Sequence, residues 1–294
     1  MSERRVDVAV IGAGTAGMGA FRAARQSTES VLLIEGAQYG TTCARVGCMP
    51  SKLLIAAAEA AHMVHKAPAF GVETAPPRIN GRAVMDRVRS ERDRFVGFVV
   101  EAVEDWPAEQ RVMGRARFAG DHLLVIERDG LVVERVEAGR IVIATGSTIV
   151  WPDHFNAAGD RLVTSDDVFY WDDLPASVAV FGGGVVGLEL GQALSRLGVR
   201  VRLFGKGGRI GIISDPEVRA AAIEALGDEL AMDLDADVQA IERVGDQVSI
   251  TFKTDEGGTV TESFDYLLAA TGRRPAVAGL ALETTSLELD DKGI

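Results

Sequence analysis

The sequence predicts an α/β fold of two doubly wound three-layer domains, each with a β-hairpin insertion. Three observations predict it. A strand, a glycine-rich turn and a helix of small residues occur together near residue 7 and again near residue 177. Each of these units is followed later in the chain by a strand that runs into Ala-Thr-Gly. Stretches with the alternation and turn residues of β-hairpins precede both of those strands, and a chain of 294 residues has room for two domains.

The first unit, DVAVIGAGTAG at residues 7–17, is an apolar strand that breaks into three glycines. This is the G-x-G-x-x-G arrangement of Rossmann-like dinucleotide-binding folds, in its strand–turn–helix context. Gly12 allows a tight turn, Gly14 lets the backbone approach a pyrophosphate, and Gly17 lets the helix pack closely on the strand. The next strand, VLLIE, ends in Glu35, whose carboxylate can accept hydrogen bonds from a ribose. The alternative is a glycine-rich turn of another α/β protein.

The second unit reads SVAVFGGGVVGLELG at residues 177–191. Its glycines at the three positions of the motif are Gly182, Gly184 and Gly187. Two dinucleotide folds in one chain indicate two bound nucleotides. That arrangement fits a flavin and a nicotinamide that exchange hydride.

The strand after the second unit lacks a closing acid. VRVRLF, at residues 199–204, is followed by Gly205, where an NAD-preferring fold has a carboxylate for the ribose. Lys206 and Arg209 come next. These cations could accept the 2′-phosphate of NADP, or they could lie on a solvated loop. The sequence therefore leaves the choice between NAD and NADP open.

The Ala-Thr-Gly turns form a matching pair. IVIATGS, at residues 141–147, contains Ala144, Thr145 and Gly146, and LLAATGRRP, at residues 267–275, contains Gly272. Each is a strand that runs into a turn of small residues, where the backbone approaches a ligand or another strand. We therefore expect both turns to lie beside the nucleotides of their own domains.

The stretch TTCARVGCMPSK, at residues 41–52, holds the only two cysteines of the chain. Four intervening residues at a bent helix start can bring two Cα atoms within disulfide range, ~4.4–6.8 Å. A helix N-terminus also favours a thiolate over a thiol. A redox pair, a metal site and inert buried thiols are the alternatives. No histidine or further cysteine completes a metal site, so none is expected.

These features together resemble the class I pyridine nucleotide–disulfide oxidoreductases, from Val6 onward. Within that family the Pro-Ser-Lys ending and GGGVVGLELG are most similar to dihydrolipoamide dehydrogenase. The resemblance implies FAD in the first domain and NAD or NADP in the second. It also implies roles for single residues: Cys43 as interchange thiol, Cys48 as the thiol nearest the flavin, Lys52 near the flavin N5, Glu189 as its ion-pair partner, and Thr42 and Ala116 as further cofactor contacts. We expect Lys52 to be buried, and a buried lysine needs such a partner.

Two residues of the cysteine motif depart from the family's usual pattern. Arg45 stands where the family commonly has asparagine, and Met49 where it has isoleucine or valine. The methionine is a tolerated change of similar volume. The arginine adds a charge beside a redox thiol, which could favour a thiolate or an anionic substrate.

The resemblance implies a reaction that passes electrons between a dithiol or disulfide substrate, the Cys43–Cys48 pair, FAD and NAD(P). The substrate would be a small molecule or a lipoyl domain, oxidised as dihydrolipoamide. Alternatives are a glutathione-type or mercuric-type reductase, or an inactive nucleotide-binding fragment. In the family a homodimer completes the site, and we doubt that this chain forms one.

The resemblance also predicts the domain organisation. We expect an FAD domain over residues 1–149, including a helical segment from about Ser51 to Trp106, and an NAD(P) domain over 150–276. Residues 277–294 would begin a return toward the FAD domain. The printed sequence ends at SLELDDKGI, before the family's Gly-Asp segment and its dimerisation domain with a His-Glu pair. None of the four histidines matches that family histidine, so we expect low dihydrolipoamide turnover.

Composition excludes several functions. The net charge is −12 and no Lys/Arg-rich run occurs, which argues against a nucleic-acid surface. No apolar run approaches the ~20 residues of a membrane span, and the N-terminal stretch does not have the pattern of a secretory signal. We therefore expect a cytoplasmic protein with no membrane partner.

Overall fold

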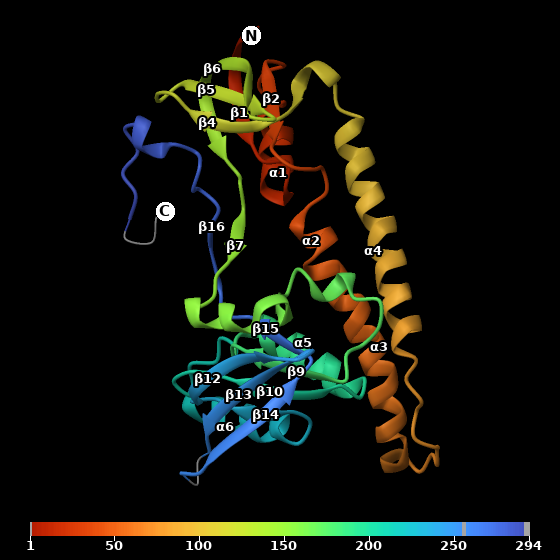
Figure 1. Cartoon of the computed structure of the whole chain (residues 1–294). Coiled ribbons are helices and arrows are strands. Elements are labelled where there is room, and N and C mark those ends of the chain that lie inside the picture. Colours follow the sequence, from red (N-terminus) through yellow and green to blue (C-terminus); the bar gives the residue numbers. More distant parts are fainter. Residues whose placement is uncertain (1, 255–256, 291–294) are drawn as a thin grey trace. The chain divides into compact units, whose positions relative to one another are not determined.

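The computed structural model describes residues 2–254 and 257–290 (Figure 1). Its internal contacts divide the chain into two compact units. The first unit comprises residues up to 45, 93–148 and from 273 onward, and the second comprises 46–92 and 149–272. Both are α/β, so the predicted fold class is confirmed.

The first unit is built on a six-stranded sheet in the order β3-β2-β1-β6-β5-β4. Strands β1, β2, β3 and β6 run parallel, and β4 and β5 add an antiparallel meander to β6. The meander is the predicted hairpin insertion, with its turn at Asp129 and Gly130, both at positive φ. The bounds are β1 (Ser2–Ile11), α1 (Thr15–Ala24), β2 (Val31–Glu35), α2 (Thr42–Arg45), β3 (Arg111–Met113), β4 (Arg115–Phe118), β5 (Leu123–Arg128) and β6 (Leu131–Ile143).

The second unit repeats this plan with a five-stranded parallel sheet, β11-β10-β9-β15-β8, and a three-stranded antiparallel sheet, β12-β13-β14. Phe204, Phe252 and Phe264 lie in the core between the two sheets. The bounds are α3 (Cys48–Lys66), β8 (Leu162–Thr164), β9 (Ser177–Phe181), α5 (Val185–Arg196), β10 (Arg200–Phe204), α6 (Pro216–Gly227), β11 (Ala231–Asp233), β12 (Asp237–Val244), β13 (Gln247–Lys253), β14 (Thr259–Phe264) and β15 (Tyr266–Ala269).

The division has a boundary between residues 148 and 149, but it assigns residues 46–92, which the prediction placed in the first domain, to the second unit. Helix α3 groups with the second unit because Leu54, Ala58 and Ala61 are buried in one core with residues of α5 and β9. The division also falls between residues 92 and 93, inside α4 (Gly81–Glu104). The remaining elements are β7 (Ser147–Ile149), which pairs with β16 (Arg273–Pro275), and 3₁₀ segments at Ala67–Phe70, Ala108–Gln110, Asp153–Arg161, Val168–Tyr170 and Leu282–Thr284.

The tail after β16 groups with the first unit. Leu280 and Leu282 are buried in the core of its sheet, and the N–H of Phe118 donates to the oxygen of Leu280 at 2.8 Å. The N–H of Ser286 donates to the carboxylate of Asp121 at 2.6 Å. The tail is thus held through at least residue 286, and the last four residues of the predicted 277–294 segment lie outside the described residues.

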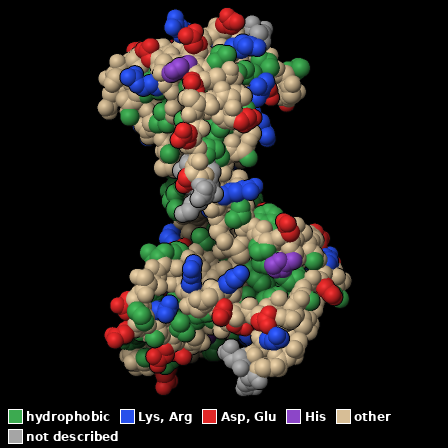
Figure 2. All heavy atoms as spheres, turned by 90° about the vertical axis from the view of Figure 1, so that its left-hand side faces the viewer, with side chains coloured by type: hydrophobic (Ala, Val, Ile, Leu, Met, Phe, Trp, Pro, Cys, Tyr) green, Lys and Arg blue, Asp and Glu red, His purple; other side chains and the backbone are tan. Residues whose placement is uncertain are grey.

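Acidic and basic side chains are intermixed on the surface. On the face shown in Figure 2, Lys and Arg side chains alternate with Asp and Glu over both units. Among the described residues, no helix is long and apolar enough to cross a membrane.

Candidate functional site

The glycine turn of the first unit is a tight backbone crossing that excludes side chains at two of its three glycines. Gly12 has φ +103°, and a Cβ there would lie 2.4 Å from the oxygen of Ala144. A Cβ on Gly17 would lie 1.8 Å from the oxygen of Gly12. Gly14, which caps α1, has no atom within 4 Å of the position that a Cβ would take. Open space at this one glycine is where a pyrophosphate can approach the helix N-terminus.

Glu35 lies beside this turn, at the end of β2. Its Oε2 accepts the N–H of Ala13 at 2.8 Å and its Oε1 accepts the N–H of Ala37 at 2.9 Å. These two bonds fix the carboxylate next to the glycines and leave it further acceptor sites. The arrangement fits the adenosine ribose of FAD.

The second unit reproduces the turn almost atom for atom. Gly182 has φ +125°, and a Cβ there would lie 2.3 Å from the oxygen of Ala270. A Cβ on Gly187 would lie 1.9 Å from the oxygen of Gly182, and Gly184 is again open. In both units, only small residues fit where the glycine turn meets the strand that crosses it.

This packing gives the physical reason for the two Ala-Thr-Gly turns. The N–H of Ala144 donates to Ile11 and the N–H of Ala270 donates to Phe181, each at 2.8 Å. Each alanine Cβ would also touch, at 3.4 Å, a Cβ placed on the third glycine of its unit. A larger residue at either alanine would push the turn away from the glycines. Thr145, Gly146 and Gly272 follow directly, at the carboxyl ends of β6 and β15.

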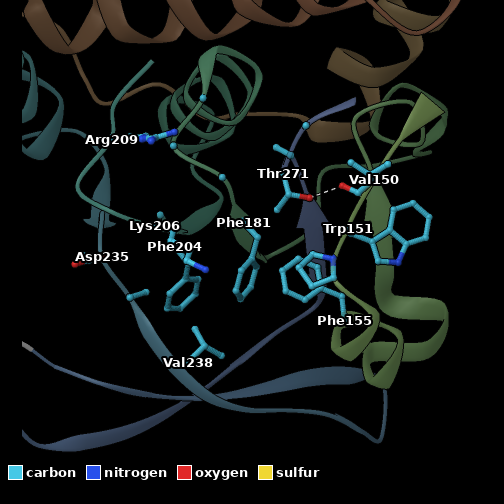
Figure 3. A pocket seen from close by; sticks show the side chains of 18 of the residues that line it. Val150, Trp151, Phe155, Phe181, Phe204, Lys206, Arg209, Asp235, Val238 and Thr271 are labelled. Carbon is cyan, nitrogen blue, oxygen red and sulfur yellow. Dashed lines mark hydrogen bonds between the residues drawn. The ribbon is translucent and has the colours of Figure 1, made fainter. Parts of the chain in front are cut away.

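A cavity of about 1070 Å³ opens at the carboxyl ends of β9, β10 and β15 (Figure 3). The glycine turn forms one part of its wall. Figure 3 shows Lys206, Arg209 and Asp235 on one side, and Thr271 and Trp151 on the other. Phe155, Phe181 and Phe204 form an aromatic wall, with neighbouring ring centroids 4.6 and 4.8 Å apart. The volume of this cavity, its glycine turn and its two cations, Lys206 and Arg209, fit a pyridine nucleotide.

Lys52 and Glu189 form the predicted ion pair. The Nζ of Lys52, on α3, donates to the Oε1 of Glu189, on α5, at 2.8 Å. The expectation of a buried lysine is wrong, because the two side chains are 58% and 38% exposed. The pair therefore joins the helix that begins at Cys48 to the helix that follows the second glycine turn, at a position open to solvent.

The two cysteines belong to different units, and each is described within its own. Cys43 is partly buried in α2, and Cys48 is exposed as the first residue of α3. The Oγ of Ser51 donates to the oxygen of Cys48 at 3.1 Å, which steadies the start of α3. Pro50 lies in the same first turn, where backbone N–H groups have no helical partner and proline is tolerated.

The side chain of Arg45 donates hydrogen bonds within the first unit. Its Nε and terminal nitrogen donate to the oxygen of Tyr39, and its side chain lies against Gly40, which has φ +102°. A Cβ on Gly40 would lie 2.6 Å from the Nε of Arg45. The guanidinium therefore fastens the loop after Glu35 to the helix that carries Cys43.

Sequence reasoning missed a buried threonine and did not foresee that one predicted contact lies in the core. Thr41, the neighbour of Thr42, is buried, and its Oγ1 accepts the N–H of Ala44 at 3.0 Å. A threonine directly before a short helix is a capping signal that could have identified it.

Ala116 is buried on β4, with its side chain in the core of the first unit. Any contact of Ala116 with a cofactor would come from its backbone.

A polar cluster between α3 and α5 was also missed. Arg196 donates to Glu229 at 2.6 and 3.1 Å and to Glu59 at 2.7 Å. His62 Nε2 lies 3.5 Å from the Glu229 carboxylate and has no hydrogen-bond partner there. Burial, and then the nearby Arg196, lower the pKa of His62, while the hydrogen bond from Arg196 lowers the pKa of Glu229. Within the described residues, no group of three or more His, Cys, Asp or Glu side chains could hold a metal ion.

The comparisons with known proteins identify the family. The model of the family described as pyridine nucleotide-disulphide oxidoreductase matches residues 6–294. The chain belongs to this family, whose members are flavoproteins that use FAD and NAD(P).

Individual relatives cover different substrates. The chain is 33% identical to a mercuric reductase of Streptomyces lividans, 32% to a glutathione reductase of Burkholderia cepacia and 30% to a dihydrolipoyl dehydrogenase of Bacillus subtilis. These matches take in 98, 100 and 98% of this chain but only 60, 63 and 62% of the relatives. The chain thus spans about three-fifths of their length.

A solved structure supports the fold. The flavoprotein disulfide reductase RclA from Escherichia coli superposes with a TM-score of 0.78, at 23% identity, over 98% of this chain and 61% of that one.

Proposed function

We propose that the chain is the FAD- and NAD(P)-binding part of a flavin-dependent disulfide oxidoreductase that resembles dihydrolipoamide dehydrogenase. The ion pair between Lys52 and Glu189 is the observation that carries the proposal. It joins the start of the redox-cysteine helix to the helix after the nicotinamide-side glycine turn, and the family resemblance implies it. The family resemblance assigns both partners of this pair to the redox site, which supports a redox role over one limited to nucleotide binding.

The residues of both turns fit their nucleotides. In the first unit, Gly14 and Glu35 would hold the pyrophosphate and ribose of FAD. In the second, Gly184 and the cations of the cavity would hold NAD(P). Bound FAD supplies a two-electron carrier between a dithiol and a nicotinamide.

The cysteines would perform the exchange with substrate. In dithiol oxidation, a substrate thiolate attacks the sulfur of Cys43 in a Cys43–Cys48 disulfide, and Cys48 leaves as a thiolate. The second substrate thiol then displaces Cys43, and the substrate departs as a disulfide. Two electrons have moved from the substrate to the cysteine pair. With Cys43 released as a thiol and Cys48 as a thiolate, the pair keeps one of the two substrate protons and the other passes to solvent. Cys48 is the first residue of α3, at the positive end of that helix's dipole.

The positively charged Lys52 would lie beside the reacting centre and be held there by Glu189. A lysine tethered by one carboxylate keeps its charge at a defined position, which a free surface lysine does not. This is a positioning and electrostatic role.

Thiol counting tests the proposal. The FAD-loaded chain is incubated anaerobically with NADH or NADPH, freed of nucleotide and titrated with a thiol reagent. We expect two additional thiols per chain, and none in Cys43→Ser or Cys48→Ser. An unchanged thiol count in the wild-type chain, with FAD bound, would contradict a redox cysteine pair.

The substrate is a separate proposal. The relatives include mercuric and glutathione reductases, so dihydrolipoamide competes with glutathione disulfide and Hg²⁺. The reduced chain is mixed in single-turnover experiments with lipoamide or with glutathione disulfide, and it is expected to lose its two thiols faster to lipoamide. Hg²⁺ binds thiols without oxidising them, so the test for Hg²⁺ is whether elemental mercury forms as the chain is reoxidised. A lipoyl-domain substrate and a homodimer of the whole protein are proposals of the same kind.

A further inference from the structure

The backbone around Gly205 excludes the acid that usually follows the second strand of a dinucleotide fold. A Cβ on Gly205 would lie 2.9 Å from both the Cα and the oxygen of Leu234. The N–H of Gly205 donates to Asp233 at 2.6 Å, and its oxygen accepts the N–H of Ala236 at 3.3 Å. The segment after β11 is therefore fastened against this residue. A side chain at 205 would force the two backbones apart.

The same segment brings a different carboxylate to the cavity. Asp235 comes from the end of β11, one strand farther along the sheet, and is exposed. Its Oδ1 accepts the N–H of Gly207 at 2.7 Å. Gly207 and Gly208 have φ +69° and +63°, which lets the loop after β10 turn its amides toward Asp235 and Leu234.

Asp235 shares the cavity with two cations. Lys206 and Arg209 line it together with Asp235, and Figure 3 shows all three on the same side. The hydrogen bond from Gly207 occupies one carboxylate oxygen of Asp235, and the other oxygen keeps its acceptor sites. This end of the cavity therefore holds a fixed anion with a free acceptor, next to two cations on long side chains.

We propose that Asp235 replaces the acid missing at Gly205 and sets the selectivity between NAD and NADP. Its carboxylate accepts the 2′-hydroxyl of NAD and repels the 2′-phosphate of NADP. Lys206 and Arg209 offset that repulsion, so the site binds both nucleotides and Asp235 shifts the balance toward NAD. The inference rests on the proposed assignment of this cavity to the pyridine nucleotide.

The charges determine which of the two nucleotides Asp235 favours. A 2′-phosphate has no hydroxyl to donate and adds a negative charge close to Asp235. Two like charges a few ångströms apart repel, and we expect this repulsion to change the affinity on the order of tenfold, which corresponds to about 1.4 kcal/mol. Loss of a cation should weaken NADPH binding by a similar factor.

Nucleotide binding to the full chain tests the proposal without requiring turnover. NADH and NADPH dissociation constants are measured by fluorescence titration for the wild-type chain, Asp235→Asn and Lys206→Gln. Asp237→Asn is the matched control, because Asp237 lines the same cavity but is paired with Lys253 at 2.9 Å. It makes the same charge change two residues away.

We expect Asp235→Asn to raise the affinity for NADPH relative to NADH about tenfold, Lys206→Gln to lower it, and Asp237→Asn to leave it within about twofold. An unchanged ratio in Asp235→Asn, or an equal shift in both aspartate variants, would overturn the inference while leaving the cavity assignment intact. If neither NADH nor NADPH bound to the wild-type chain or to the variants, the cavity assignment would be overturned and the inference with it.

Discussion

The ammonium of Lys52 lies 2.8 Å from the carboxylate of Glu189, although 137 residues separate them in the chain. Both side chains are more than a third exposed. An exposed ion pair of this kind contributes only ~0–1 kcal/mol to stability. The pair therefore adds little to the stability of the fold, which is compatible with the charge-positioning role proposed for Lys52 above.

Lys52→Gln should accordingly separate stability from function. We expect the urea-unfolding midpoint to change little, because one exposed pair is lost. The rate at which NADH reduces FAD in the loaded chain should fall at least several-fold. Stopped-flow absorbance and unfolding curves measure the two effects. The reversed pair Lys52→Glu with Glu189→Lys serves as control: full recovery of the rate by the reversed pair would contradict a role for positive charge at position 52.

The first glycine turn offers a matched pair of alanine variants. Gly17→Ala places a Cβ 1.8 Å from the oxygen of Gly12, so the helix must move, at a cost of roughly 1–3 kcal/mol. Gly14→Ala meets no atom within 4 Å and should fold normally.

The two variants should nevertheless both lose FAD affinity. In Gly14→Ala the methyl group occupies the space left for the pyrophosphate, whereas in Gly17→Ala the turn itself is displaced. Equilibrium unfolding and FAD titration separate the two cases. Normal FAD binding by Gly14→Ala would show that the pyrophosphate does not approach this residue.

The cluster around His62 predicts a pH effect on stability. Burial lowers the pKa of His62 from its ordinary 6.5, so below pH 6.5 the unfolded chain binds a proton that the folded chain resists. Stability should therefore decline as pH falls from about 7 through the lowered pKa. Glu59, Lys66, Arg196 and Glu229 face the imidazole.

His62→Gln removes this proton uptake. The free energy of unfolding of the variant should fall less steeply between pH 7 and pH 5. The stability that ionised Glu229 contributes is still lost in acid, because its lowered pKa stabilises the folded chain only at pH values where Glu229 is ionised. Parallel wild-type and variant slopes across that window would show that His62 titrates freely in the folded chain.

Much of the site can be predicted from local patterns. The G-x-G-x-x-G glycines, Glu35 and the Ala-Thr-Gly turns are predictable because each satisfies a short-range steric rule. Gly12 and Gly182 each lie against the backbone oxygen of an alanine more than 80 residues away. The contact is distant in sequence, but it requires small residues on both sides, and these are visible in the two short motifs. The Lys52–Glu189 pair follows from resemblance alone, since nothing local couples α3 to α5.

Other features depend on tertiary packing that the sequence does not display. The buried contacts of Leu54, Ala58 and Ala61 with the second unit's core decide which unit α3 joins. The role of Asp235 depends on its strand lying beside β10 and on the steric exclusion at Gly205. The exposure of Lys52 likewise depends on what surrounds the helix start.

A visible absorption spectrum of the FAD-loaded chain, recorded anaerobically before and after one equivalent of dithiol, would show whether electrons pass through the cysteine pair. We expect flavin bands and, on reduction, a new long-wavelength absorbance from a Cys48 thiolate against the flavin, absent in Cys48→Ser. A chain that binds FAD but shows the same spectrum with and without dithiol would contradict an electron relay through Cys43 and Cys48.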